Sequence, residues 1–334
     1  MKKHSNIPIF IPELACPHQC VFCNQEKISG THSIPQPKDV RSIVEQYLKT
    51  IPQNRIINIA FYGGSFTGIP VDRQEQYLKE ACVFIKTGMV SGIRLSTRPD
   101  YINETILELL KKYGVTTIEL GAQSTSREVL HQSERGHTPE DIQNASRMIR
   151  TYGFELGIQM MIGLPEDSYE RSMQTANDIV SYGAHTTRIY PAIVVKGTAL
   201  EQKYREGNYI PLSLEQAVKW TKDLVRIFEK NDISVIRMGL HPSDELVIGK
   251  SLIDGPFHPS FKEMVMTKIW EEIIHAKLKG NTSNNISISV SDKQIHYAIG
   301  YKQINKIQLQ SKGYKVRFAG NHTFSQYQID VCDN

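Results

Sequence analysis

Three cysteines close together near the start of the chain are the residues best suited to chemistry. Cys16, Cys20 and Cys23 have the spacing Cys-x3-Cys-x2-Cys, so their thiolates can reach one common centre from a single loop. Soft thiolate ligands favour iron-sulfur clusters, zinc or copper(I). A structural zinc site closes with four protein ligands, and an electron-carrying 4Fe-4S cluster usually has four cysteines. Three cysteines therefore predict a cluster with one iron left open for a further ligand.

Two other interpretations of these cysteines are weaker. A zinc site with His18 as fourth ligand would place that ligand inside the same short loop and strain its closure around the ion. Disulfides would leave an odd thiol, and nothing marks the chain as secreted. Cys82 lies in an apolar-periodic stretch, where a free cysteine is usually a small buried hydrophobe.

The composition is that of a soluble globular protein. The chain has 334 residues, 40% of them hydrophobic, a mean hydropathy of -0.34 and a formal net charge of +4. The apolar run 7–11 is interrupted by Pro8 and is too short for the core of a signal peptide, and no stretch approaches the length of a membrane span. We therefore expect a cytoplasmic protein without membrane contact. The mild positive charge permits a polyanionic partner but does not by itself indicate one.

Short β-branched runs alternate with longer amphipathic runs along the first two thirds of the chain. The predicted strands are 7–11, 56–62, 92–97, 115–121, 154–162 and 185–190. Helical patterns separate them, and Thr138, Pro139 and Asp141 predict a helix start with a capping box. Strands alternating with helices favour a parallel sheet with right-handed crossovers, and six such units suggest a partial (β/α) barrel.

Unusual residues follow each predicted strand. In chain order they are the cysteine loop, 62–66, 96–100, 121–124, 163–165 and 190–191. In (β/α) barrels the carboxyl ends of the strands carry the chemistry, because loops there can vary while the opposite face maintains stability. The sequence therefore predicts one site formed by all six strand ends.

Each motif at these ends also has a structural interpretation. Gly63 and Gly64 either make a tight turn or, with Ser65, let backbone approach a ligand. Arg98 is either an ion-pair partner or a ligand for ribose hydroxyls or a carboxylate. Gln123 suits ribose recognition, with an exposed loop amide as the alternative. For 135–137, which precede a helix, a structural loop is favoured over catalysis.

The cysteine spacing is the signature of the radical S-adenosylmethionine superfamily, and further motifs resemble the radical domain of the Elongator catalytic subunit. The matching segments are 96–101, 118–124, 135–138, 160–165 and 188–198, within a region of about residues 7–220. The resemblance implies a six-unit partial barrel that binds a 4Fe-4S cluster and S-adenosylmethionine, generates a 5′-deoxyadenosyl radical and modifies the wobble uridine of tRNA. It also implies tRNA and an electron donor such as flavodoxin or ferredoxin as partners.

The same resemblance assigns the site residues. Cys16, Cys20 and Cys23 would hold the cluster. The residues that would line S-adenosylmethionine are Phe22, Gly63, Gly64, Ser65, Ser96, Arg98, Gln123, Met161, Gly163 and Pro165. Tyr190 and Lys196, which follow the sixth strand, would stack on and pair with a substrate, the alternative being that they only shape the loop and face solvent.

This sequence also departs from the Elongator pattern. Its first cysteine interval is shorter, and the residues after Trp220 contain no obvious acetyl-CoA loop, so we expect no acetyltransferase domain there. A porphyrinogen-oxidising enzyme and a non-enzymatic iron-sulfur or haem-binding module remain alternatives. The former would have an aromatic residue and another cysteine after the cluster, where this chain has Asn24 and Gln25.

The last third of the chain has a different pattern. A helix is predicted over 260–278, and strands over 286–290, 314–318 and 327–331. We therefore divide the chain into a radical-enzyme barrel, 1–231, and a small α+β subdomain, 232–334. Lysines and an arginine in this tail, such as Lys302 and Arg317, are more often solvent-facing charges than a binding surface.

Overall fold

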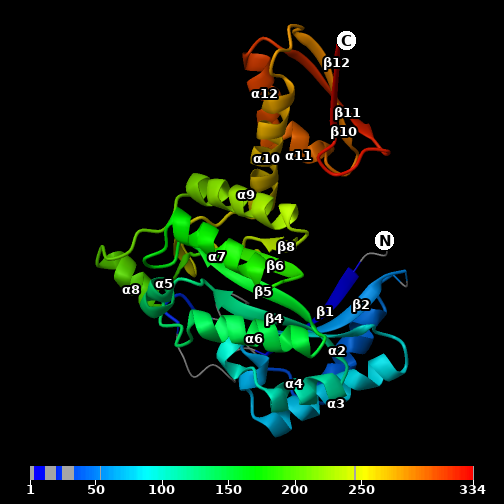
Figure 1. Ribbon diagram of the computed structural model, residues 1–334, viewed down its shortest axis with the longest axis vertical. Coiled ribbons are helices and arrows are strands. Elements are labelled where there is room, and N and C mark those ends of the chain that lie inside the picture. Colours follow the sequence, from blue (N-terminus) through cyan, green and yellow to red (C-terminus); the bar gives the residue numbers. More distant parts are fainter. Residues whose placement is uncertain (1–3, 12–19, 25–33, 53, 244–245, 334) are drawn as a thin grey trace.

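A parallel sheet of seven strands forms the larger part of the molecule (Figure 1). The computed structural model describes residues 4–11, 20–24, 34–52, 54–243 and 246–333. Neighbouring strands are parallel throughout, in the order β1-β2-β3-β4-β5-β6-β8. Their bounds are β1 His4–Ile11, β2 Ile56–Gly63, β3 Gly92–Thr97, β4 Val115–Gln123, β5 Glu155–Ile162, β6 Thr186–Pro191 and β8 Ser234–Met238.

Helices pack on the outer face of this curved sheet. They are α2 Asp39–Leu48, α3 Val71–Lys86, α4 Glu104–Lys112, α5 Arg127–Gln132, α6 Pro139–Thr151, α7 Tyr169–Ser181 and α9 Leu214–Lys230, with short 3-10 turns at Phe66–Gly68 and Pro99–Tyr101. All of them except α5 lie on or beside a strand that they follow or precede, whereas α5 lies near α8 Ala199–Arg205 (Figure 1). Thr138 caps α6, and the capping box with Asp141 predicted from the sequence is confirmed.

The two faces of the sheet differ because side chains alternate along each strand. On β4, Ile118 and Leu120 are fully buried against the helices, whereas Glu119 between them faces the inner side of the curve. On β1, Ile7 and Ile9 are buried in the same apolar layer. Burying each such side chain contributes about 1.5–3 kcal/mol, so the outer layer supplies most of the stability. The inner face is left to polar groups.

The predicted half-barrel is confirmed, and the sheet extends beyond the predicted units. β8 pairs with β6 and adds a strand that was not predicted from the sequence and that lies after the predicted boundary at residue 231. A small antiparallel pair, β7 Val194–Val195 and β9 Leu252–Asp254, and helix α8 Ala199–Arg205 lie beyond the end of β6. The division at 231 stays a prediction, and in the structure the parallel sheet continues past it to Met238.

A smaller α+β subdomain follows and stands beyond α9 at one end of the molecule (Figure 1). Its elements are α10 Phe261–Lys277, β10 Asn285–Ser291, α11 Ile295–Ile299, the 3-10 turn η3 Tyr301–Gln303, α12 Ile304–Ser311, β11 Lys315–Asn321 and β12 Ile329–Asp333. Helix α10 joins the two parts, since Phe261 and Val265 belong to the main core while Trp270 and Ile274 belong to that of the subdomain. Across the described residues, no helix is long and apolar enough to cross a membrane.

Candidate active site

The described part of the cysteine loop, residues 20–24, is held by two backbone contacts. The Val21 N–H donates to the Ser133 carbonyl (3.2 Å), and the Leu200 N–H donates to the Val21 carbonyl (2.7 Å). Cys20 and Cys23 occupy one tight turn, in which the Cys23 N–H donates to the Cys20 carbonyl (2.9 Å). Cys20 is buried and Cys23 half-buried. Cys16, the third predicted ligand, lies outside the described residues.

Arg135 is the charged group next to the cysteine loop. Its Nη1 lies 3.0 Å from the Cys20 Sγ, and its Nη2 donates to the Gly121 carbonyl at 2.7 Å. Arg135 is 5% exposed, so its charge acts on the sulfur with little screening by water. The sequence analysis favoured a structural role for this loop. The contact with Cys20 instead makes Arg135 part of the candidate site.

Gly63 allows the ends of β1 and β2 to approach closely. It has a φ of +111°, and a Cβ there would lie 3.0 Å from the Ile11 carbonyl carbon and oxygen. The Gly64 N–H donates to the Ile11 carbonyl (3.0 Å), and Ser65 is buried beside it. The turn interpretation therefore accounts for Gly63. The predicted roles of Gly64 and Ser65 toward a ligand stay predictions.

Arg98 pairs within its own loop. It is 2% exposed, and its Nε and Nη2 donate to the two carboxylate oxygens of Asp100 at 3.0 and 2.9 Å. The guanidinium also lies over the ring of Tyr101. Of the two roles that the sequence left open, ion pairing describes these contacts, with Arg98 buried and Asp100 exposed. Ser96 is half-buried and is paired in register with Glu119 of β4.

Gln123 ends β4 in a strained conformation. Its φ is +70°, in the left-handed region, which costs a residue other than glycine about 1–3 kcal/mol. Its Oε1 accepts a hydrogen bond from Gln159 Nε2 (3.1 Å), and it is 5% exposed. Gly121, two residues earlier, lies close to this side chain, since a Cβ there would lie 3.1 Å from Gln123 Nε2. The side chain is therefore positioned, and the exposed-amide alternative is wrong.

The segment 163–165 follows β5, is fixed by hydrogen bonds to Gly163, and packs near Phe22 of the cysteine loop. The Gly163 N–H donates to Asp167 Oδ2 (2.8 Å), its carbonyl accepts from the Tyr209 hydroxyl (2.6 Å), and its φ is +72°. Pro165 is buried. Phe22 and Met161 both pack against a small cluster that contains Leu164. Four residues predicted to line one ligand, Phe22, Met161, Gly163 and Pro165, thus lie in one small region.

Tyr190 and Lys196 lie in different surroundings. The Tyr190 hydroxyl accepts a long hydrogen bond from Arg188 Nη1 (3.5 Å) on the inner face. Lys196 is exposed, and its N–H donates to the Ser251 carbonyl (2.8 Å) beside the β7–β9 pair. The pKa of Glu201 is lowered by the Gly197 N–H and by Arg205, with Lys196 a smaller cause. Tyr190 therefore lies on the inner face, and Lys196 lies beside the β7–β9 pair.

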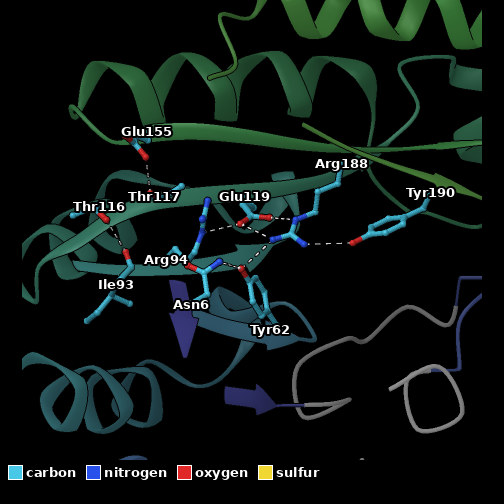
Figure 2. Close-up of polar contacts among 10 residues, drawn as sticks. All are labelled: Asn6, Tyr62, Ile93, Arg94, Thr116, Thr117, Glu119, Glu155, Arg188 and Tyr190. Atoms are coloured by element: carbon cyan, nitrogen blue, oxygen red, sulfur yellow. Dashed lines mark hydrogen bonds and ion pairs between the residues drawn. The ribbon is translucent and has the colours of Figure 1, made fainter. Parts of the chain in front are cut away.

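A buried charge network crosses the inner face, which the sequence analysis did not predict (Figure 2). Glu119 of β4 pairs with Arg94 of β3 at 2.9 Å and with Arg188 of β6 through two contacts of 2.5 and 3.2 Å. Arg188 Nη2 also donates to the Tyr62 hydroxyl (3.0 Å), to which Asn6 donates from β1 at 3.4 Å. Side chains from β1, β2, β3, β4 and β6 therefore converge on one point.

The network carries one excess positive charge. Two guanidinium groups face one carboxylate, and Glu119 and Arg94 are 3% and 9% exposed. Burial alone would lower the pKa of Arg188, but the Glu119 carboxylate outweighs it and raises that pKa. Burial and, second, Glu119 raise the pKa of Tyr62 to about 12, so its hydroxyl keeps its proton at neutral pH. The inner face can thus receive an anionic or strongly polar group.

The sequence contains a sign of this network, namely charged residues inside strands that are otherwise apolar. Arg94 stands between Ile93 and Leu95, and Glu119 between Ile118 and Leu120. A charged residue at the inward position of an otherwise apolar strand must be paired, because an isolated buried charge is very costly. The partners lie far apart in the sequence, so only the strand order brings them together.

The comparisons with known proteins agree with this architecture. The model of the Radical SAM superfamily matches residues 11–179, and that of the Radical_SAM C-terminal domain matches residues 184–271. The chain therefore belongs to the radical SAM superfamily, a family of enzymes whose cofactors are S-adenosylmethionine and a 4Fe-4S cluster.

Named relatives place the chain near the Elongator group. A tRNA uridine(34) acetyltransferase of Methanocaldococcus jannaschii is 26% identical over 246 residues, 61% of this chain and 45% of the relative. Elongator complex protein 3 of Saccharomyces cerevisiae is 27% identical over 173 residues, 46% of this chain and 31% of the relative. The chain spans less than half the length of either. The resemblance to the radical domain of the Elongator catalytic subunit is confirmed.

A solved structure has the same fold. The archaeal Methanocaldococcus infernus Elp3 with an N-terminal deletion matches with a TM-score of 0.63 and 20% sequence identity, covering 85% of this chain and 65% of that chain. At this identity the match shows the fold alone, and it includes the curled parallel sheet described above.

Proposed function

We propose that this protein cleaves S-adenosylmethionine at a 4Fe-4S cluster held by Cys16, Cys20 and Cys23, and acts on a nucleoside of tRNA. The observation that carries the first part is the buried Cys20 thiol with the Arg135 guanidinium 3.0 Å away. The guanidinium N–H groups of Arg135 can donate to the sulfur atoms of a bound cluster. The described cysteines therefore fit a cluster ligand set.

The cluster, when bound, supplies the electron that splits S-adenosylmethionine reductively to a 5′-deoxyadenosyl radical. In this proposal the residues of the chain bind S-adenosylmethionine and orient it beside the cluster. Arg135 would place a positive charge beside the cluster and could attract the carboxylate of S-adenosylmethionine. Gln123, held by Gln159, presents an amide toward ribose hydroxyls. Phe22, Gly64, Ser65, Ser96, Met161, Gly163 and Pro165 line the remaining cofactor surface in this proposal.

The proposed substrate rests on the relatives and on the inner face. The relatives are named tRNA uridine(34) acetyltransferase and Elongator complex protein 3. The Arg94–Glu119–Arg188 network has one excess positive charge, which suits a phosphate or an electron-rich base edge. Tyr190 extends this polar surface. We propose that a nucleoside reaches the inner face with its anionic backbone nearby, and that a flavodoxin or ferredoxin supplies the electron.

The cluster assignment is tested by anaerobic reconstitution. We expect one 4Fe-4S cluster per chain and formation of 5′-deoxyadenosine. Cys20→Ala should abolish both, because losing one of three ligands leaves the irons unsupported. Cys82→Ala is the matched control, since Cys82 is a half-buried thiol on α3 that packs against the main core, and it should keep the cluster. Stoichiometric zinc with no iron uptake would refute the assignment.

The substrate is tested separately. Adding tRNA should raise 5′-deoxyadenosine formation above the uncoupled background, and Lys196→Ala should remove the stimulation while sparing the background. Lys230→Ala, which changes an exposed lysine at the end of α9, should leave the stimulation intact. If tRNA gives no stimulation in reconstituted wild-type enzyme, the tRNA assignment fails and the radical chemistry stands.

A further inference from the structure

The C-terminal subdomain contains a cavity that the proposed reaction does not use. Its volume is about 620 Å³, and it lies between α10, the turn η3, α12 and strand β11. Its lining combines three cationic side chains, Lys302, Lys306 and Arg317, with three aromatic ones, Tyr297, Tyr301 and Phe318. The cavity borders the turn that joins helices α11 and α12. Its lining suits a ligand that has both anionic groups and flat ring systems.

The charge of the lining is one-sided. Three cations face a single carboxylate, Glu263, among the residues that line the cavity. Lys302 and Arg317 are exposed, Lys306 is half-buried, and among the described residues none of the three forms an ion pair. The lining therefore favours an anionic ligand.

The turn at the mouth of the cavity is held in an unusual conformation. Gly300, Lys302 and Gln303 have φ values of +91°, +52° and +62°. Left-handed backbone costs each of the two residues other than glycine about 1–3 kcal/mol, and such strain is concentrated at functional sites. The turn thus presents its backbone in a fixed shape that the local sequence alone would not favour.

Buried hydrogen bonds fix this turn from behind. Asn305 is 3% exposed and donates from its Nδ2 to the carbonyls of Thr267 (3.0 Å) and Ala298 (3.2 Å). The Thr267 hydroxyl accepts from the Tyr301 N–H (2.8 Å). At Gly300 a Cβ would lie 3.0 Å from the Asn305 backbone nitrogen, so a larger residue does not fit. The turn is therefore preorganised for a ligand.

The topology around the turn matches a known way of binding nucleic acid. Strands β10 and β11 are parallel, and the chain between them forms α11, the turn 300–303 and α12. KH modules clamp four nucleotides of single-stranded backbone against a Gly-x-x-Gly loop. Here Gly300 occupies the first position. Gln303 replaces the second glycine, yet it keeps the left-handed backbone that glycine would supply.

We propose that this cavity binds single-stranded nucleic acid, with the backbone phosphates at the turn 300–303 and at Lys302, Lys306 and Arg317. The aromatic rings supply faces on which bases stack, as in other single-strand sites. Every base has a flat face that can stack, so we expect the site to recognise the phosphate backbone more than the base sequence. The inference goes beyond the proposed radical chemistry and does not depend on it, because binding needs neither cluster nor S-adenosylmethionine.

The test uses the full chain and fluorescently labelled single-stranded RNA and DNA of about 12 nucleotides, with a duplex of the same sequence as competitor. Lys302→Glu combined with Arg317→Glu reverses two cavity charges. The matched control is Lys293→Glu combined with Lys315→Glu, which makes the same charge change at two exposed lysines of the subdomain outside the cavity. Thermal unfolding of all variants checks that the subdomain stays folded.

We expect the cavity variant to lose at least tenfold in affinity and the control variant less than about twofold. The slope of log affinity against log salt should fall by about 1.4 for the cavity variant, since each lost phosphate contact on a single strand contributes about 0.7. Equal binding of RNA and DNA supports phosphate recognition, and a preference for RNA supports a 2′-hydroxyl contact in addition.

Three results would overturn the proposal. They are no measurable binding by the wild-type chain, an equal loss in the control variant, and competition by the duplex as strong as that by the single strand. Cluster content and background 5′-deoxyadenosine formation are measured on the same variants. Because neither should change, failure of nucleic-acid binding remains distinguishable from failure of the radical chemistry.

Discussion

The inner and outer faces of the curved sheet use the same strands for opposite purposes. On the outer face, Ile118 and Leu120 are buried among the apolar side chains of the helices. On the inner face, Glu119 lies between them in sequence but joins two arginines and, through Arg188, a tyrosine. Alternation along a strand thus separates packing from polar chemistry at a spacing of one residue.

The two faces also differ in what a defect would do. Apolar packing is spread over many contacts, and loss of one side chain leaves a cavity that neighbours partly fill. The inner-face network has few members, and removal of one leaves buried charge behind. Neighbouring residues on the two faces therefore provide matched pairs for experiments.

The largest stability effect is expected for Glu119→Gln. This substitution removes the carboxylate that pairs with both Arg94 and Arg188, and within the described part of the chain no other carboxylate forms an ion pair with these two largely buried guanidinium groups. Breaking a buried pair in this way costs about 3–5 kcal/mol in the free energy of unfolding, measured by urea denaturation. Glu155→Gln is the control, since that exposed carboxylate accepts from the neutral Thr117 hydroxyl, and it should cost under about 1 kcal/mol. Equal losses in the two variants would contradict the distinction between the faces.

A slightly smaller effect is expected for Ile118→Ala on the outer face. Ile118 is fully buried, so the substitution removes apolar contact and leaves a cavity at a cost of about 2–5 kcal/mol. Ile118→Val should cost about 0.5–1.5 kcal/mol. Reconstituted Ile118→Ala should keep its cluster and its background cleavage at low temperature. A loss of cleavage larger than the loss of folded protein would show that the outer face takes part in the site.

Local patterns in the sequence predicted most of the elements. Strands such as 92–97 and the helix start at Thr138 depend on residues close in the chain, and both are confirmed. The inner-face network depends on strand order and on pairs such as Arg188 with Glu119, which are 69 residues apart. The sequence does not state which strands become neighbours. For that reason the candidate site was predicted at the strand ends, and the charges deeper in the half-barrel were missed.

Three further differences between prediction and structure concern Arg98, Arg135 and strand β8. Arg98 satisfies its charge on Asp100 two residues away, a partner that a prediction based on strand ends alone does not weigh. Arg135 was interpreted as a structural loop because its contact with Cys20 spans 115 positions. β8 was missed because it is short and its single neighbour in the sheet, β6, lies before α9.

A pH-dependent effect is expected at the rim of the inner face. His137 is buried, and burial, then the charges of Arg135 and Arg98, lower its pKa to about 3. Below about pH 6.5 the His137 imidazole is protonated in the unfolded chain, whereas in the folded chain it stays neutral until the pH approaches 3. His137 therefore contributes stability above pH 6.5 that is lost as pH falls toward 3. At pH 5 the loss is about 2 kcal/mol, from 1.36 kcal/mol per unit over 1.5 units.

Urea denaturation at several pH values measures this contribution. His137→Gln keeps a side chain able to donate to the Ala122 carbonyl, which His137 Nε2 contacts at 3.2 Å. Because glutamine does not titrate, the variant should lose less stability than the wild type between pH 6.5 and 5. Identical pH profiles would show that His137 is not held neutral.

The smallest effect is expected one residue further on, where the chain returns to the outer layer. The Thr138 hydroxyl accepts from the Asp141 N–H (3.2 Å), and Asp141 Oδ2 accepts from the Thr138 N–H (2.7 Å), which together cap α6. Thr138→Ala removes the first of these bonds and should cost about 1 kcal/mol, while Thr138→Ser keeps the hydroxyl and should cost a few tenths. Neither substitution changes a group that titrates near neutral pH. The Thr138→Ala stability curve should therefore run parallel to that of the wild type between pH 6.5 and 5, whereas the His137→Gln curve should converge on the wild-type curve or cross it. If Thr138→Ala also changed the pH profile, the rim and the outer helix would be energetically coupled and the separation of the two faces would fail at this point.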